Sequence, residues 1–227
     1  MLEQTIDFAS ARLTARASGA LWWPARRLLC VADLHLAKSE RIAWRGGALL
    51  PPYETRDTLA RLAAEMAALD PATVLCLGDS FDDMAGAAAL DPADRDRLAE
   101  LVAGRDWIWL AGNHDPAPHG LGGTCAETLV LGPLTFRHAA QAETEPGEVS
   151  GHYHPKLRVP LRAGALTRPC FLWDRRRLIL PAFGAYTGGL DAAAPALAAL
   201  VEPDARAILT GDPCVILPAY TRPARRA

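Results

Sequence analysis

Three apolar runs, each ending in polar side chains, decide the fold of this chain: RRLLCVADLH at residues 26–35, TVLCLGDS at 73–80 and WIWLAGNHD at 107–115. Near-continuous apolar runs of this length are typical of strands that are buried on both faces of a sheet. The intervening segments are long enough for helices. The order strand, helix, strand, helix, strand over residues 26–112 predicts a parallel sheet with right-handed crossovers.

Two helices are predicted between these strands. The first begins near Tyr53 and ends before Pro71, which cannot continue a helix. Its apolar residues recur three or four positions apart, as they do on one face of a helix: Leu59, Leu62, Met66 and Leu69. The second begins after Asp91, a favourable N-cap residue, with Pro92 in the first helical position.

Beyond residue 125 the pattern changes to short β-type runs separated by turns, among them LTFRHA at 134–139, EVSGHYH at 148–154 and RLILPAF at 177–183. Strand-like runs also precede the parallel unit, at residues 11–17 and 20–24. No linker or repeat interrupts the sequence. We therefore expect an α/β fold with two sheets, packed as a single domain over residues 1–227.

The composition is that of an ordinary globular protein. The chain has 227 residues, of which 50% are hydrophobic and 22% charged, and its formal net charge is −2. These values argue against disorder and against a polybasic nucleic-acid binder, although they allow a local basic groove. The five cysteines show no C-x-x-C spacing, and Glu3 and Asp7 stand where a signal peptide would be basic and then apolar. We therefore expect a cytoplasmic protein without membrane association.

Side chains that can bind metals gather where the predicted strands end. Two of them follow the first run, one follows the second, three follow the third, and three end later β runs: Asp33, His35, Asp79, Asn113, His114, Asp115, His138, His152 and His154. Ligands of open α/β sheets bind beyond the carboxyl ends of the strands. Asp-x-His and His-x-His on extended backbone would each direct both side chains to one face.

The residue types narrow the choice of ion. Oxygen and imidazole ligands without a nearby cysteine favour manganese, iron, zinc or cobalt over calcium or structural zinc. Leaving aside His114 and Asp115, seven candidate ligands remain. Seven are too many for one transition metal that keeps an open position. They fit two ions about 3.5–4 Å apart that share a carboxylate. We expect two divalent transition metal ions, with manganese as the first choice.

These motifs, in this order, resemble the calcineurin-like metallophosphoesterases. The resemblance rests on DLH at 33–35, GD at 78–79, GNHD at 112–115, the single His138 and GHYH at 151–154. It implies a four-layer αββα sandwich and an assignment of ligands. One metal would be bound by Asp33, His35 and His154, the other by Asn113, His138 and His152, with Asp79 bridging them. His114 would stabilise the transition state or protonate the leaving oxygen, and Asp115 would orient His114.

Stretches that extend beyond the metal motifs are similar to a narrower group, the PdeM-type proteins described as ligase-associated DNA damage response endonucleases. They are residues 33–52, 77–83, 136–139, 151–159, 168–173 and 178–189. The sequence departs from that group at Ala37, where glycine is commoner, and at Asp82, where histidine is expected. The resemblance implies a DNA endonuclease linked to repair, with a DNA ligase or helicase as candidate partners.

The function we expect is hydrolysis of phosphodiester bonds by in-line attack of a metal-bound hydroxide, most simply on DNA. Two alternatives remain open at this point. The metal motifs fit equally a phosphodiesterase or phosphatase for a small nucleotide or other phosphoester, which the near-neutral charge favours. A non-catalytic scaffold with this fold is the third possibility, although such proteins usually lose ligands that are intact here.

Basic side chains near the metal motifs are candidates for binding substrate phosphates. The chain has 22 arginines and only two lysines, and each lysine follows a metal motif. The candidate substrate-binding residues are Lys38, Arg41, Arg45, Lys156 and Arg158. Such contacts would position a nucleic acid without reading its bases. Solvated loop charges are the plain alternative.

Overall fold

Three parallel strands form the centre of the first sheet, as the sequence predicts. β4 (Leu28–Val31) pairs with β5 (Thr73–Cys76), and β5 pairs with β6 (Asp106–Leu110), both in parallel. The computed structural model describes residues 2–38, 53–116, 120–162 and 164–220. Arg41 and Arg45, two of the predicted substrate-binding residues, lie outside these ranges.

The first sheet extends on both sides of this parallel unit. Its described strands follow the order β1-β2-β3-β4-β5-β6-β7, in which β1 is Glu3–Phe8, β2 is Ala11–Arg16, β3 is Leu21–Trp23 and β7 is Thr124–Ala126. A short 3-10 helix, Pro24–Arg26, joins β3 to β4. Strand β1 was not predicted from the sequence; it pairs antiparallel with β2 along its whole length.

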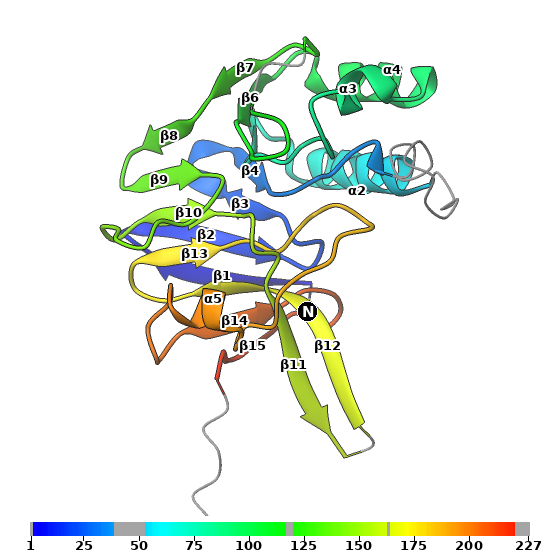
Figure 1. The fold of residues 1–227 in the computed structure, drawn as a ribbon. Helices are drawn as coiled ribbons and strands as arrows, with labels where there is room; N and C mark the ends of the chain where they lie inside the picture. Colours follow the sequence, from blue (N-terminus) through cyan, green and yellow to red (C-terminus); the bar gives the residue numbers. More distant parts are fainter. Residues whose placement is uncertain (1, 39–52, 117–119, 163, 221–227) are drawn as a thin grey trace, which may run out of the picture.

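The second sheet holds the β-rich half of the chain. Its described strands follow the order β15-β14-β12-β13-β10-β9-β8, and β11 pairs only with β12. The bounds are β8 Thr128–Leu131, β9 Leu134–Arg137, β10 Glu148–Ser150, β11 Lys156–Leu161, β12 Gly164–Trp173, β13 Arg177–Ile179, β14 Arg206–Leu209 and β15 Val215–Pro218. Strands β9, β10 and β13 run parallel, so this sheet also gathers carboxyl ends at one edge (Figure 1).

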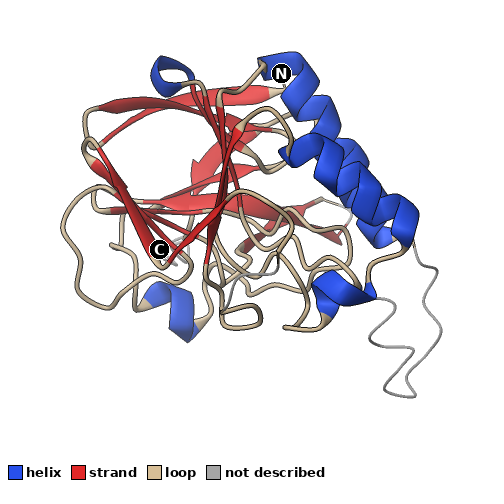
Figure 2. Ribbon diagram, turned by 90° about the horizontal axis from the view of Figure 1, so that it is seen from above, coloured by secondary structure: helices blue, strands red, loops and turns tan. Residues whose placement is uncertain are grey.

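Alternation along the strands separates the layers. In and just after β5, Leu75 and Leu77 face the core between the two sheets, whereas Val74 and Cys76 pack under the helices. The helices over the first sheet are α2 (Glu54–Leu69), α3 (Gly86–Ala89) and α4 (Pro92–Val102). They lie together on one side of the strands in Figure 2. The fourth layer is slight, because α5 (Pro195–Ala198) is the described helix there.

This arrangement confirms the predicted αββα sandwich. The apolar face of α2 is buried as expected, with Leu59, Leu62 and Met66 inside the helix-side core. The start of α4 also has the predicted cap, since the Asp91 carboxylate accepts a hydrogen bond of 3.0 Å from the backbone N–H of Ala93. Burial of these apolar faces positions the strands, and their carboxyl ends are the residues considered next.

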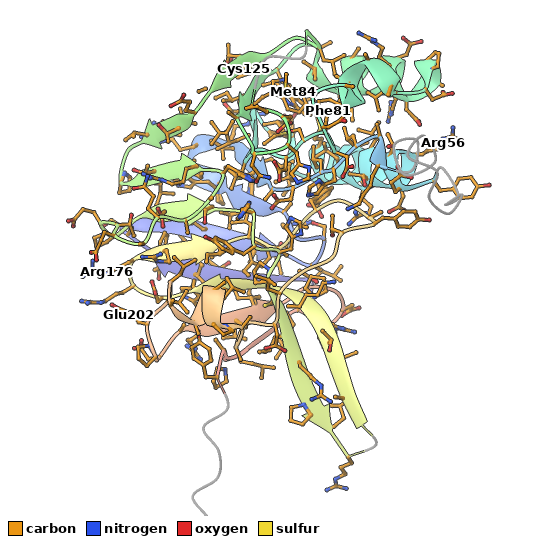
Figure 3. The ribbon with its side chains drawn as sticks, in the orientation of Figure 1. Arg56, Phe81, Met84, Cys125, Arg176 and Glu202 are labelled. Carbon is orange, nitrogen blue, oxygen red and sulfur yellow. The ribbon has the colours of Figure 1, made fainter. Side chains whose placement is uncertain are left out.

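Charged pairs on the flanks belong to the scaffold. Arg56 of α2 lies 3.5 Å from the carboxylate of Asp94 in α4, which links the two helices. Near the other end of the molecule, Arg176 lies 3.7 Å from Glu202 (Figure 3). In both pairs the arginine is exposed to solvent, and ion pairs with such a partner contribute at most about 1 kcal/mol each. The buried charges with larger consequences are the carboxylates at the strand ends.

Candidate metal centre

The structure brings together the metal-binding residues predicted from the two halves of the chain. The first sheet contributes the residues that follow β4, β5 and β6, and the second sheet contributes those that follow β9 and β10: Asp33, His35, Asp79, Asn113, His114, His138, His152 and His154. Backbone hydrogen bonds join the loops, since the N–H of Gly184, after β13, donates to the carbonyl of Asp33 over 3.1 Å. The site therefore lies where the carboxyl ends of both sheets meet.

Asp33, His35 and His154 form the first group. Each offers one ligand atom, and these atoms all lie within 4.8 Å of one another. The Asp33 Oδ1 atom is 3.4 Å from His154 Nε2. Among the described residues, Asp33 Oδ1, both ring nitrogens of His35 and His154 Nε2 are buried without a hydrogen-bond partner. Buried polar atoms without partners are rare, so a cluster in which each of three residues offers one ligand atom fits a bound cation.

Asn113, His138 and His152 form the second group, beside Asp79. His138 Nε2 lies 2.8 Å from Asn113 Oδ1, 3.0 Å from His152 Nδ1 and 3.4 Å from Asp79 Oδ2. The other nitrogen of His138, Nδ1, contacts the carbonyl oxygen of Leu77 at 2.8 Å. A carbonyl only accepts, so Nδ1 carries the proton and the Nε2 of the neutral ring presents a lone pair. The atoms His138 Nε2 and Asn113 Oδ1 both present lone pairs and lie 2.8 Å apart, and a cation bound by both atoms would account for this approach.

The electrostatics of the site also fit cations. The carboxylates of Asp33 and Asp79 are almost fully buried, at 0% and 2% exposure. Two buried negative charges are unfavourable unless positive charge accompanies them. Burial and the neighbouring His138 lower the pKa of His152, which favours the neutral ring that can bind a metal. The two groups adjoin, because the backbone N–H of His152 in the second group donates to Asp33 Oδ2 in the first, over 2.8 Å.

The backbone of the ligand pairs differs from the extended form that the sequence suggested. β4 ends at Val31 and β10 at Ser150, so both pairs lie in loops. Asp33 and His35 have φ values of 53° and 45°, and His152 and His154 have 70° and 47°. Alternate left-handed residues still direct both members of a pair to the same site. Asp33 and His35 fall in one ligand group, whereas His152 and His154 fall in two neighbouring groups, and the expected extended geometry was wrong for both pairs.

Two motif glycines are needed because the ligands approach the backbone closely. A Cβ atom on Gly112 would lie 2.2 Å from Asp79 Oδ1, and one on Gly151 would lie 2.6 Å from Asp33 Oδ2. Real Cβ atoms do not come so close to another heavy atom. The absent side chains leave room for backbone N–H donors: His152 N–H donates to Asp33 Oδ2, and His114 N–H donates to Asp79 Oδ1, over 2.8 and 2.9 Å. These bonds hold the carboxylates in place.

His114 lies at the open side of the site, but Asp115 does not hold it. His114 is exposed, and its Nε2 atom is 3.9 Å from Asp79 Oδ2. Its Nδ1 atom contacts the carbonyl oxygen of Asp82 at 2.7 Å. The Asp115 carboxylate instead accepts from the backbone N–H groups of Ser80 and Phe81, at 2.8 and 3.1 Å. Adjacent residues direct their side chains apart here, so the expected orienting role of Asp115 needs correction.

Asp115 therefore stabilises the turn after β5. Burial raises the pKa of its carboxyl group to about 6, and the nearby Asp79 adds to this effect, while the backbone donors of Phe81 and Ser80 oppose it. By holding that turn, Asp115 positions the backbone next to Asp79. It acts on the site through the loop rather than through the ring of His114.

Asp82 lies at the site, although no role was predicted for it from the sequence. Its carboxylate Oδ1 lies 3.6 Å from His35 Nδ1 and 3.9 Å from Lys38 Nζ, and it shares a third ligand-like group with His35 and His114. Its carbonyl oxygen is the atom that meets His114. The spacing of three residues after Asp79 was the available sequence signal. The departure from histidine at this position therefore places a carboxylate beside a predicted ligand.

The predicted substrate-binding residues are only partly gathered at the site. Lys38 reaches Asp82, as described. Lys156 Nζ is 3.5 Å from the carbonyl oxygen of Thr187. It lines a cavity of about 530 Å³ together with Arg61. Arg158 is exposed on β11, further along the chain from His154.

Comparison with known families decides the identity of the fold. A family model described as calcineurin-like phosphoesterase matches residues 26–212. The chain belongs to the calcineurin-like phosphoesterase family. The family model spans the loops that carry the ligand groups on both sheets, so this phosphoesterase is a metal-dependent hydrolase.

A solved structure supports the same assignment over almost the whole chain. The crystal structure of Pseudomonas putida nuclease MPE aligns with a TM-score of 0.71 and 31% sequence identity. The alignment covers 92% of this phosphoesterase and 97% of that chain. Among curated proteins, none matches the sequence. In the described residues, no helix is long and apolar enough to cross a bilayer.

Proposed function

We propose that this phosphoesterase is a DNA endonuclease that uses two metal ions. The observation that carries the proposal is the pair of adjoining ligand groups, one around Asp33 and one around His138 and Asp79, which meet where the N–H of His152 donates to Asp33 Oδ2 over 2.8 Å. Sites for two ions that share a carboxylate are typical of phosphodiester hydrolysis. The similarity to a nuclease along 97% of that protein's chain supports a polynucleotide as the substrate.

Each ligand group would hold one ion. Asp33, His35 and His154 would bind the first ion, and the second would be bound by Asn113, His138 and His152, with Asp79 between the two. The bound ions would supply Lewis acidity toward the phosphate and a nucleophile derived from water. The proton on His138 Nδ1, fixed by the carbonyl of Leu77, keeps Nε2 directed at the second site.

His114 is placed to act on the leaving oxygen. Its contact with the carbonyl of Asp82 requires the Nδ1 atom to keep its proton. The proton that can be given away is therefore the one on Nε2 of the doubly protonated ring. Asn113 and His114 are exposed, whereas Asp33 and Asp79 are buried, so substrate approaches the site from the His114 side. A well-placed general acid contributes about 10²–10⁴-fold to the rate.

Basic residues around the site would hold phosphates that flank the bond to be cut. Lys38 is close to the site through Asp82, and Lys156 and Arg61 line the cavity of about 530 Å³ beside the loop after β13. Arg158 follows on β11, and Arg41 and Arg45 complete the proposed set. Contacts of this kind position the backbone of a nucleic acid without selecting bases.

The cellular setting is proposed from side-chain chemistry and from resemblance. All five cysteines are free, which is typical of a reducing compartment such as the cytoplasm. The ligand set of carboxylates, imidazoles and one amide suits manganese, with iron, zinc or cobalt as alternatives. The PdeM-type resemblance points to a repair setting with a ligase or helicase nearby.

Product analysis tests the substrate class. Protein loaded with manganese is incubated with circular duplex DNA, linear duplex DNA, single-stranded DNA and cyclic nucleotides. We expect nicking or linearisation of the circular duplex DNA, which only an endonuclease can produce. Hydrolysis confined to cyclic nucleotides would assign the site to small phosphodiesters. An absence of hydrolysis of every ester, bis-p-nitrophenyl phosphate included, would contradict the catalytic assignment.

A further inference from the structure

A two-stranded arm projects from the body of the molecule. It consists of β11 and the first half of β12, paired antiparallel from Lys156 opposite Pro169 to Leu161 opposite Gly164 (Figure 1). The second half of β12, from Cys170, pairs with β14 and β13 inside the second sheet. Apart from a single β-bridge between Lys156 and Asp191 at the base, these six pairs have no further strand beside them among the described residues. Six residues at about 3.4 Å each give the arm a length of about 20 Å.

The arm carries positive charge only. Residues 155–173 contain Lys156, Arg158, Arg162 and Arg168, and no aspartate or glutamate, in a chain whose net charge is −2. Arg158 and Arg162 are exposed. Within the described residues, neither of these two arginines has an ion pair. Their charge is therefore available to a partner.

The base of the arm is fixed beside the metal centre. Lys156, its first residue, follows His154 by two positions. Its backbone is anchored by two hydrogen bonds, because its N–H donates to Leu190 over 2.8 Å and its carbonyl accepts from Ala192 over 2.7 Å. The arm thus starts at the site and extends away from it. A molecule that lies along the arm reaches the metal centre at one end.

We propose that this arm binds the phosphate backbone of the polynucleotide substrate, several nucleotides away from the bond that is cut. The proposal rests on the nuclease function proposed above and extends it to a binding surface. Unpaired arginines in a row complement a row of phosphates. Within a duplex each strand advances about 3.4 Å per phosphate, and an extended single strand advances further, so the arm spans at most about six nucleotides. Short substrates cannot reach Arg162, whereas longer ones can.

The test compares an arm variant with a control of equal charge. The arm variant is Arg158→Gln with Arg162→Gln. The control is Arg12→Gln with Arg95→Gln, two exposed arginines on β2 and α4. For both, kcat/KM is measured on single-stranded DNA of four and sixteen nucleotides as the salt concentration is varied, with bis-p-nitrophenyl phosphate as the reference ester.

We expect the arm variant to lose the preference for the longer strand, while the control keeps it. The slope of log(kcat/KM) against log[salt] on the sixteen-nucleotide strand should become shallower by about 0.7 for each lost contact, so by about 1.4 in total. An arm variant with the length preference and salt slope of the control would overturn the arm proposal and leave the nuclease function standing. Wild-type protein that hydrolyses the reference ester but no DNA would reject both.

A second copy of the chain is the competing occupant of the arm, because Leu161 and Leu166 are exposed near its tip. Sedimentation of the same variants distinguishes the two cases. A wild-type protein that remains monomeric at working concentrations supports the nucleic-acid assignment. A dimer that dissociates in the arm variant, together with an unchanged salt slope on DNA, would make the arm a self-association surface instead.

Discussion

The side chains directed at the metal centre are held by backbone conformations that their residue types disfavour. Asp33, His35, Asp79, His152 and His154 all have positive φ, between 45° and 70°. Each such residue carries strain of about 1–3 kcal/mol, which the surrounding structure must offset. Hydrogen bonds to the carboxylates from the N–H groups of His114 and His152 supply part of that compensation. Half of the described non-glycine residues with positive φ, five of ten, are thus proposed metal ligands.

Asp79→Asn should reduce metal content more than a change at any other single ligand. Its carboxylate is 3.4 Å from His138 Nε2 and is the proposed bridge, so its loss removes charge shared by two cations. Metal content is measured by mass spectrometry after desalting. Asp96→Asn, an exposed change on α4, is the matched control. Retention of about two equivalents of metal by Asp79→Asn would rule out the bridging role.

His114→Asn should keep both metals and lose turnover. The loss should reach about 10²–10⁴-fold for an ester with a poor leaving group. It should be smaller for a nitrophenyl ester, whose leaving oxygen needs no proton. Steady-state rates on an alkyl and a nitrophenyl diester, together with metal content, separate these effects. Equal losses on both esters would assign His114 to charge stabilisation of the phosphate rather than to proton transfer.

The sequence identified the ligand types but not every contact among them. Asp33, His138 and His154 could be recognised as candidate ligands because carboxylate and imidazole groups bind metals. The roles of Asp115 and Asp82 were not, for two different reasons. Asp115 stands next to His114 in the chain, and adjacency does not reveal that the two side chains diverge. Asp82 meets His114 through its carbonyl oxygen, a group that every residue has and that no residue type signals.

At the scale of elements, the sequence predicted the buried strands and the amphipathic helix correctly. It did not predict where β10 ends, and it missed the edge strand β1. The runs that became β4, β5 and β6 were recognised because they are almost continuously apolar, and the apolar stripe of α2 was recognised by its helical period. EVSGHYH was expected to be one strand, but β10 ends at Ser150 because the residues beyond it turn toward the metal centre. β1 was missed because its segment, EQTIDF, contains few apolar residues and occupies a sheet edge.

Gly112→Ala should disrupt the turn that follows β6. The new Cβ atom would lie 2.2 Å from both the backbone nitrogen and Oδ1 of Asp79, so the loop has to move. Forced overpacking usually destabilises a protein by about 1–3 kcal/mol. Gly188→Ala, where nothing lies within 4 Å of the added atom, is the matched control. Chemical denaturation and metal content are measured for both; wild-type stability and metal content in the Gly112→Ala variant would contradict the close approach.

For the molecule as a whole, the metal centre is where the two sheets are joined. His138 on the second sheet bonds the carbonyl of Leu77 after β5, and Phe183, after β13, donates to Ala32 after β4, both over 2.8 Å. Bound cations would add ligand bonds across the same gap, since His154 and Asp33 come from different sheets. Metal binding is therefore expected to contribute to the stability of the entire fold.

Chelation should lower the melting temperature. A ligand present at about 1,000 times its Kd stabilises the native state by about 4 kcal/mol. For a protein of this size, that corresponds to about 8–16 °C. Calorimetry with manganese and with EDTA measures the shift, and one transition in each scan is expected for the predicted single domain. The shift should vanish in Asp79→Asn; equal melting temperatures for wild-type protein in both conditions would contradict the coupling.

The junction between the sheets also has a consequence for how the protein matures on the ribosome. His152 N–H bonds the carboxylate of Asp33, a residue 119 positions earlier in the chain. The first sheet can form while the chain is still being synthesised, because its strands are consecutive in sequence. The ligands from the second sheet emerge later, and strands β12 to β15 follow them. Metal capture would thus follow translation of the second sheet's ligands, and a nascent chain that has not reached His154 would lack part of the proposed site.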